Sequence, residues 1–184
     1  DAVVQGANLK AEQGDVTIAA ADNLGMNAFT VTAAASGTVS AAGYMAYNYI
    51  GGNPGSSGDD ATNVVSARVE DDASILAESI GVNASSNSAI SAYTVGASVS
   101  VYASIVGSTS LNFTRKDVEA SVSDSVLTAT AGDIRIHAQD TSSIISASAQ
   151  LSVAVYGGSV GVTVAHNDIA NTIEASSTNA QLIA

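Results

Sequence analysis

The chain has 184 residues, of which 46% are hydrophobic, 4% aromatic and 12% charged. Its 17 acidic residues against 5 basic ones give a net charge of −12, which excludes the basic surface that a nucleic-acid-binding protein needs. The absence of Cys excludes disulfides, thiolate metal sites and cysteine catalysis.

The low aromatic content implies a core of Ala, Val, Ile and Leu, and such side chains suit thin, closely spaced β-sheets. Ser, Thr, Asn and Gly take the polar role that charged residues usually have, which is typical of repetitive β architectures. No segment approaches the ~18 uninterrupted apolar residues of a membrane span, so we expect no membrane insertion. The chain shows no signal peptide and does not begin with Met, and we interpret it as a segment of a longer, secreted protein.

The first recognisable element lies at residues 9–20, which read LKAEQGDVTIAA. Its pattern, L-x-A-x-x-G-D-[VI]-x-I-x-A, returns at residues 127–138, which lie 118 positions later. A third copy, without the Gly-Asp turn, lies between these two, and in it we align residues 90–92 with 145–147. The chain is therefore an internal repeat, which is the signature of a solenoid.

These copies predict one solenoid segment over residues 1–184, made of three degenerate units. The approximate bounds of the units are 7–73, 74–124 and 125–184. An Asn marks the same place in each unit, at Asn48, Asn112 and Asn167. The average unit has about 59 residues, which we divide into three rungs of about 20 residues, a common length for one turn of a parallel β-helix.

Local periodicity predicts strands within the units. From Ile145 to Tyr156 apolar residues alternate with Ser, Gln and other residues at period two, without the 3.6-residue spacing of a helix. We expect the apolar members of this alternation, such as Ile145, Leu151 and Val153, to point into the core. The predicted fold class is all-β, a parallel β-helix or β-solenoid with about 20 residues per rung.

One segment interrupts the alternation. Residues 51–60 contain the only Pro of the chain and four Gly, so they predict a loop inserted into the first unit. Inserted loops of solenoids leave from a corner and often carry function, although a tolerated excursion without function explains the same sequence. Three Tyr residues precede this loop closely. The candidate binding residues are Tyr44, Tyr47, Tyr49, Asn53, Asp59 and Asp60.

Residues suited to catalysis or metal binding are sparse. His137 and His166 are the only histidines, and no nucleophile motif accompanies them, so we expect no enzymatic activity. The acidic run at 70–72 and the pair Asp59-Asp60 lack the repeated Gly- and Asp-rich pattern of calcium-binding solenoids. We expect solvated turns there, no cofactor, and at most weak Ca²⁺ binding.

The sequence also resembles a known family. The cadence of residues 132–138 (GDIRIHA), 144–149 (IISASA) and 158–175 resembles the repeats of very large bacterial filamentous adhesins, in particular leukotoxin-like and haemagglutinin-like surface proteins. The resemblance covers essentially the whole chain, but the middle unit lacks the Gly-Asp turn and the first carries the loop. It implies a right-handed β-helix in an extracellular stalk at the bacterial cell surface, without catalytic residues.

Three functions follow as hypotheses. The first is a structural element of an extracellular fibre, whose partners are flanking repeats or further copies stacked end to end. The second is a binding module, in which the region 44–60 contacts a glycan or a host protein. The third, a polysaccharide-active enzyme, is the weakest, because a cleft of carboxylates and basic residues is hard to build with five Lys and Arg.

Overall fold

The structure is a computed structural model that describes residues 1–52 and 63–184, and the described residues form strands, turns and bends without a helix. Residues 53–60 of the predicted loop lie outside the described part. The fourteen strands are β1 (Ala2–Gln5), β2 (Asn8–Lys10), β3 (Val16–Ser36), β4 (Val39–Ile50), β5 (Asn63–Glu70), β6 (Ser74–Ala77), β7 (Ile80–Ser100), β8 (Ala103–Thr114), β9 (Lys116–Ser123), β10 (Val126–Ala129), β11 (Ile134–Ala154), β12 (Gly158–Ile169), β13 (Thr172–Thr178) and β14 (Gln181–Ile183).

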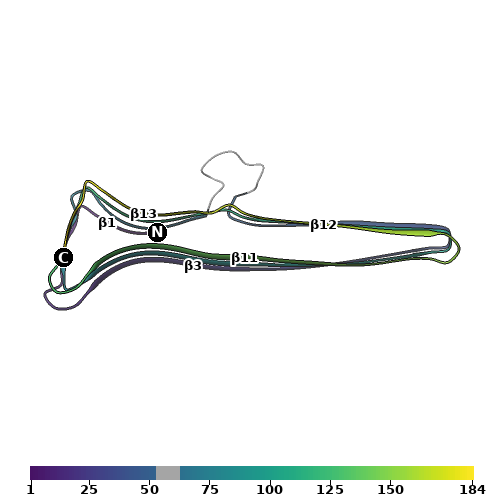
Figure 1. The fold of residues 1–184 in the computed structure, drawn as a ribbon, viewed down its shortest axis with the longest axis horizontal. Helices are drawn as coiled ribbons and strands as arrows, with labels where there is room; N and C mark the ends of the chain where they lie inside the picture. Colours follow the sequence, from purple (N-terminus) through teal and green to yellow (C-terminus); the bar gives the residue numbers. More distant parts are fainter. Residues whose placement is uncertain (53–62) are drawn as a thin grey trace.

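All strand pairs are parallel, and the strands form four sheets. The sheets have the orders β1-β5-β9-β13, β14-β10-β6-β2, β11-β7-β3 and β12-β8-β4. The chain visits these four sheets in a fixed rotation, and we call one circuit a pass, as in β3 to β6, β7 to β10 and β11 to β14. The strands of each pass lie beside those of the previous one (Figure 1). The prediction of an all-β fold with parallel sheets is therefore confirmed, and the arrangement is consistent with a β-solenoid.

The strand register corrects the predicted rung length. Ser142 pairs with Ser88, 54 residues earlier, and Asn167 pairs with Asn112, 55 residues earlier. Between the first two passes the offset is 64 residues, as for Asn112 and Asn48. The shorter predicted rung is wrong because β3, β7 and β11 are each 21 residues long, so that one pass requires an entire repeat unit.

The register also corrects one detail of the repeat alignment. Ile90 pairs with Ile144, whereas the sequence alignment placed it opposite Ile145. A shift of one residue exchanges the two faces of a strand. The alignment of Asn48 with Asn112 and Asn167, in contrast, matches the observed pairs.

Two parts of the molecule differ in cross-section (Figure 1). We call the wider part the base; it comprises residues 1–22, 63–86, 115–140 and 170–184. We call the narrow part the blade; it comprises residues 23–48, 87–112 and 141–167, in which the outward halves of β3, β7 and β11 face β4, β8 and β12.

The base holds the hydrophobic core. Its fully buried side chains come from three walls and include Val82 on β7, Val118 on β9 and Leu127 on β10. Alternate residues of each wall point inward, and burying aliphatic side chains of this size contributes roughly 1.5–3 kcal/mol each. Here the predicted core of Ala, Val, Ile and Leu is confirmed.

One corner of the base recurs in every pass and needs an unusual backbone conformation. Gly6, Asp71, Asp124 and Asn179 all have positive φ, between 45° and 58°. Gly, Asp and Asn are the residues that enter this left-handed region most readily. The acidic run at 70–72 thus contributes to a turn, as predicted. Asp is found there because it tolerates the positive φ that the turn requires.

In the blade the expected orientation of the apolar residues is reversed. Ile145, Leu151 and Val153 are 57%, 60% and 40% exposed, although the sequence predicted that they point inward. The intervening Ser146, Ser148, Gln150 and Ser152 instead make hydrogen bonds toward the inside. The apolar stripe of the alternation therefore lies on the outer surface.

Hydroxyl groups join the two sheets of the blade. Ser98 on β7 shares hydrogen bonds with Ser40 (2.6 Å) and Ser104 (2.8 Å), and Ser152 donates to Ser104 (3.0 Å). Small side chains allow two sheets to approach closely, and a buried hydroxyl must find a partner to avoid an uncompensated loss of hydration. A hydrogen-bonded layer thus accompanies the few buried apolar residues of the blade, among which Ile90, Ala92 and Val106 are at most 1% exposed.

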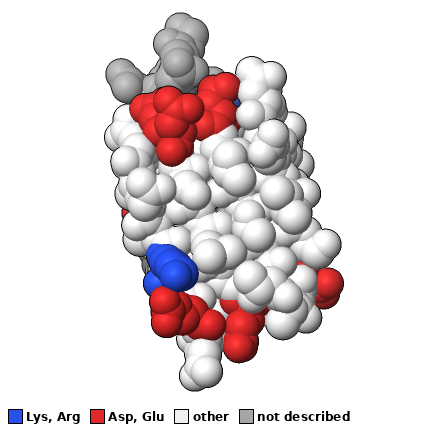
Figure 2. Space-filling model, turned by 90° about the vertical axis from the view of Figure 1, so that its left-hand side faces the viewer, with Lys and Arg blue, Asp and Glu red and all other residues white. Residues whose placement is uncertain are grey.

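Among the residues that the structure describes, charge is confined to the base and its junction with the blade. None of the 17 acidic and 5 basic residues falls within the blade ranges. At the base end of the molecule the acidic groups gather in two bands on opposite edges, separated by an uncharged surface (Figure 2). The molecule is therefore strongly polarised along its long axis.

The predicted loop leaves and rejoins the base beside one residue of the next pass. The Arg115 N–H donates to the Ile50 carbonyl at 2.9 Å, and the Arg115 carbonyl accepts from the Asn63 N–H at 3.2 Å. A Cβ on Gly51, whose φ is +86°, would lie 1.9 Å from that same carbonyl. Glycine is required at this exit because both the φ angle and the close approach exclude a side chain.

Candidate functional site

The three predicted tyrosines divide between two sides of β4. Tyr47 and Tyr49 point outward and are 43% and 44% exposed. Tyr44 points inward between the sheets, where a Cβ on Gly96 would lie 2.6 Å from its ring, and its hydroxyl has no hydrogen-bond partner. The other predicted site residues, Asn53, Asp59 and Asp60, lie outside the described residues.

Tyr47 and Tyr49 belong to an aromatic cluster that extends over three passes. The ring centroid of Tyr47 lies 5.8 Å from that of Tyr49 and 5.5 Å from that of Phe113. The Phe113 ring lies 5.6 Å from the imidazole of His166. These separations fall within the range for favourable aromatic pairs, and we call Tyr47, Tyr49, Phe113 and His166 the aromatic cluster.

An ion pair borders the aromatic cluster. The Arg115 guanidinium lies 3.5 Å from the Asp168 carboxylate, and both side chains are about one-third exposed. A pair in this environment contributes little to stability. Aromatic faces beside a guanidinium and a carboxylate can, however, bind a polar ligand with an apolar face, such as a sugar ring.

Phe113, His166, Arg115 and Asp168 were not predicted as partners of the tyrosines. The spacing between the aligned asparagines of successive passes could have identified these neighbours. Tyr49 pairs with Phe113, and Phe113 with Asp168, in the same register as the asparagines. A rung of about 20 residues, as predicted, does not bring these residues side by side. His137, the other histidine, lies on β11 and is exposed.

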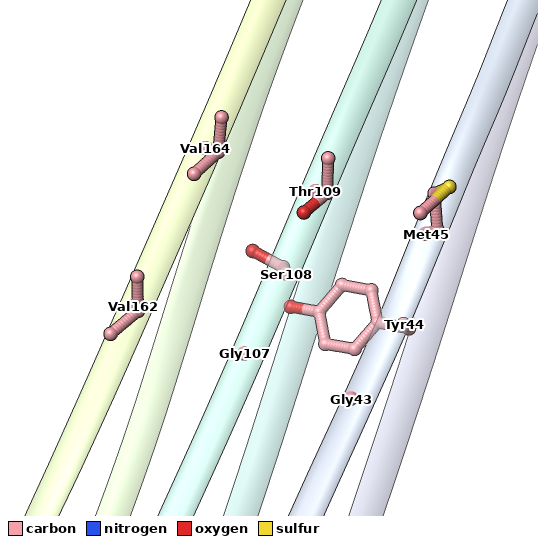
Figure 3. Close-up of a pocket in the computed structure, with 8 residues that line it drawn as sticks. All are labelled: Gly43, Tyr44, Met45, Gly107, Ser108, Thr109, Val162 and Val164. Atoms are coloured by element: carbon pink, nitrogen blue, oxygen red, sulfur yellow. The ribbon is translucent and has the colours of Figure 1, made fainter.

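A shallow groove crosses the outer face of β4, β8 and β12 next to the aromatic cluster. The paired glycines Gly43 and Gly107 form its floor, because neither carries a side chain to fill the row between its neighbours. The groove has a volume of about 510 Å³. The residues along it are Gly43, Tyr44, Met45, Gly107, Ser108, Thr109, Val162 and Val164 (Figure 3).

Behind the aromatic cluster, inside the molecule, an asparagine ladder connects the passes. Asn48 donates to the Asn112 side-chain oxygen at 2.8 Å, and Asn112 donates to Asn167 at 2.8 Å. Asn112 is fully buried. Because each amide both donates and accepts, stacked asparagines at equivalent positions satisfy one another.

A buried cation lies nearer the base. Lys116 is 0% exposed, and its Nζ donates to the Asp22 carboxylate at 2.8 Å and to the Ser86 hydroxyl at 2.7 Å. The three residues come from β9, β3 and β7, so this contact joins two walls and two passes. Asn63 also donates to Asp22, at 2.9 Å.

An equivalent acid serves the third pass. Asp140, which shares its strand position with Asp22 and Ser86, accepts hydrogen bonds from Ser142 and Asn171. Burial alone would raise the pKa of Asp140, but the hydrogen bonds from Ser142, Asn171 and Ser86 outweigh it and hold the pKa below the usual value of an aspartate. We call Asp22, Ser86, Asp140, Asn63, Lys116 and Asn171 the polar partition, since it separates the core of the base from the blade.

The polar partition is a structural feature rather than a site for a ligand. Every charged group in it already has a partner within the protein, and Lys116 has no exposed surface. Within residues 1–52 and 63–184 no group of three or more His, Asp or Glu side chains could hold a metal ion. In the same ranges no helix is long and apolar enough to cross a membrane.

Comparison with known proteins adds no assignment. Neither the protein-family models, nor the curated proteins, nor the solved structures contain a match to this chain.

The buried ion pair makes a strong prediction for stability. Asp22→Ala should lower the free energy of unfolding by about 3 kcal/mol or more, because it leaves a buried ammonium group without its counter-charge. The double variant Asp22→Ala/Lys116→Met should recover most of this loss. Urea unfolding of the single and double variants measures both effects.

Lys10→Met is the matched control for Lys116→Met. Lys10 pairs with Glu12 on the surface, where both side chains are well exposed, so its loss should change stability by less than about 0.5 kcal/mol. If Asp22→Ala were as mild as Lys10→Met, the polar partition would not hold the walls together.

The lowered pKa of Asp140 predicts how the free energy of unfolding depends on pH. A carboxyl whose pKa is lower in the folded state stabilises the protein above its unfolded pKa, and this stabilisation is lost as the pH falls through the folded pKa. The stability difference between the native chain and Asp140→Asn should therefore be constant above about pH 5 and shrink at lower pH. Urea unfolding at a series of pH values tests this.

Ser142→Ala tests whether hydrogen bonding to Ser142 lowers the pKa of Asp140. It removes the hydrogen bond from the Ser142 hydroxyl to the Asp140 carboxylate and keeps the one from the Ser142 backbone N–H, so the pKa of Asp140 should rise and the loss of stability should begin at a higher pH. An unchanged carboxyl titration by NMR in Ser142→Ala would contradict the explanation.

Proposed function

We propose that this chain is a scaffold segment of an extracellular bacterial filament or adhesin stalk, in the form of a closed, right-handed β-solenoid. The observation that carries the proposal is the in-register parallel pairing of every wall over successive passes. Such a coil can be continued indefinitely by adding further passes, as in other repeat architectures. The sequence resemblance to filamentous surface adhesins supports the extracellular location and the handedness.

The internal contacts agree with a scaffold role. The asparagine ladder, the hydroxyl layer of the blade and the polar partition each connect one pass with the next. Polar contacts that repeat at equivalent positions fix the register of the stack, because a slip by one residue would leave buried groups unpaired. A fixed register between passes is what a long stalk requires, and it requires no ligand site.

Tandem fusion of the chain tests the scaffold proposal. Ile183 pairs with Thr128, and Thr128 with Leu76, which in turn pairs with Lys10, so Ala184 falls at the position of Ala11 in the coil. A second copy that begins at Glu12 should therefore continue the coil in phase. Small-angle scattering should show one rod that lengthens by about 14 Å per added copy, since each adds three passes at about 4.8 Å.

An out-of-phase fusion is the control. A second copy that begins at Val39 enters the wrong sheet after β14 and should give two separate particles joined by a linker. If the in-phase fusion also behaved as separate particles, the chain would not be a continuable segment and the scaffold proposal would fail.

A second candidate function is recognition of a glycan by the aromatic cluster. It is favoured by the exposed rings of Tyr47 and Tyr49 beside Phe113 and the ion pair of Arg115 with Asp168. Uncharged sugars stack on such rings through their apolar faces.

A glycan array with the native chain and two variants tests this candidate. Tyr47→Ala should lower the binding of any captured oligosaccharide at least about tenfold, in line with the loss of a central aromatic contact. Tyr156→Ala, which removes a tyrosine that is 81% exposed at the far end of the blade, should leave binding unchanged. Equal loss in both variants, or no capture at all, would reject the aromatic cluster as a binding site.

A further inference from the structure

The two outer faces of the blade carry no charged residue and are largely apolar toward the tip. On β3, β7 and β11 the four outward rows nearest the tip contain only apolar side chains. These residues are Phe29, Tyr93, Ala147, Val31, Val95, Ala149, Ala33, Ala97, Leu151, Ala35, Val99 and Val153. The opposite face presents Val39, Ala41, Met45, Ile105, Val160, Val162 and Val164, with the glycine groove between them.

Each face is comparable in size to the largest apolar patch of an ordinary monomer. Four outward rows span about eight residues, or about 26 Å, along the strands, and three strands span about 14 Å, so one face covers on the order of 360 Å². The largest apolar patch of an ordinary monomer is about 300–600 Å², and this molecule has two such faces back to back. A standard protein interface buries about 800 Å² per partner, so one face-to-face contact of this size corresponds to a weak association, in which a copy inside a row has both of its faces covered.

The two faces differ in shape. Phe29 and Tyr93 are paired neighbours on β3 and β7, and they form a ridge that is 71% and 43% exposed. On the other face the paired Gly43 and Gly107 form the floor of the groove. The ridge and the groove floor each run across two neighbouring parallel strands, β3 and β7 for the ridge and β4 and β8 for the groove, so the first can fit into the second when two blades lie face to face.

We propose that the blade is a self-association surface, on which a second copy of this chain lays its Phe29–Tyr93 ridge into the Gly43–Gly107 groove. Because the ridge and the groove lie on opposite faces, each copy uses both faces and the copies form a sideways row. This lateral contact goes beyond the scaffold proposal, which concerns stacking along the coil, and it does not depend on it.

Charge distribution favours a second copy over other partners. Two copies that each carry −12 repel one another, but none of the residues of the facing blades is charged. A lipid bilayer is a poorer partner, because the edges of β3 and β4 and of β11 and β12 carry backbone groups that are unpaired within this chain and that hydrocarbon cannot satisfy. In a row of blades these edges stay in contact with water.

Complementary single-face variants of the 184-residue chain test the proposal. Val31→Glu places a charge on the ridge face and Met45→Glu places one on the groove face, at positions that are 61% and 65% exposed, so neither should disturb folding. In sedimentation velocity the native chain should form oligomers that grow with rising concentration. Each variant alone should be monomeric, and an equimolar mixture should form a heterodimer through the two unaltered faces.

Two controls separate this outcome from the alternatives. Val64→Glu, a half-exposed outward position on β5 in the base, should associate like the native chain, and circular dichroism should show the same β-sheet signal for all variants. A monomeric native chain, or variants that associate like the native chain through their coil ends, would overturn the proposal. So would dimers of either variant alone, or flotation of the native chain with phosphatidylcholine vesicles that Val31→Glu abolishes.

Discussion

The hydrogen-bonded ladder between successive passes is the constraint on which the rest of the structure depends. It places each residue directly beside the residue one pass away, so that Asn48, Asn112 and Asn167 share one environment although two full passes separate the first from the last. A side chain in such a stack must be compatible with its own copy above and below. Amides, hydroxyls and small aliphatic side chains meet this condition, whereas like charges stacked at the usual strand spacing repel one another.

This condition explains how charge is arranged inside the molecule. Asp22 and Asp140 occupy equivalent positions in the first and third passes, and the second pass has Ser86 between them. On the opposite wall Lys116 lies between Asn63 and Asn171. Only one of three equivalent positions is cationic, and it faces the gap between two anions. The alternation of charged and neutral groups thus permits a polar layer that identical residues in every pass would destabilise.

The sequence predicted the parts of the fold that depend on local pattern. Period-two alternation identified the strands, and the recurrence of Leu9 and Gly14 at Leu127 and Gly132 identified the repeat. The direction of the alternation was not predictable in the same way, because Ile145 and Leu151 satisfy an inward or an outward face equally well until the partner strand is known. The aromatic cluster depends on the length of a pass, so Phe113 and His166 could not be assigned to Tyr47 from the shorter predicted rung.

The inverted blade shows why hydrophobicity alone misleads in a thin, two-layered structure. Small hydrogen-bonded side chains fill the space between the two sheets at Ser98, Ser104 and Ser152, while Leu151 next to Ser152 lies on the surface. Most large apolar residues of the blade are exposed, and Ile90 and Val106 are the buried exceptions. The usual link between burial and hydropathy is therefore much weaker in the blade than in the base, within the same strands.

The attachment of Ile50 and Asn63 to the same residue, Arg115, has a consequence for how such chains can diversify. Since both the exit and the return of the first pass are fixed by the backbone of the next pass, the number of residues between them is independent of the register of every other strand. The first interval of the repeat is longer than the second, yet β7 pairs with β3 and β11 without interruption. This corner is therefore a point at which segments of different length and chemistry can be exchanged on an unchanged rod, by evolution or by design.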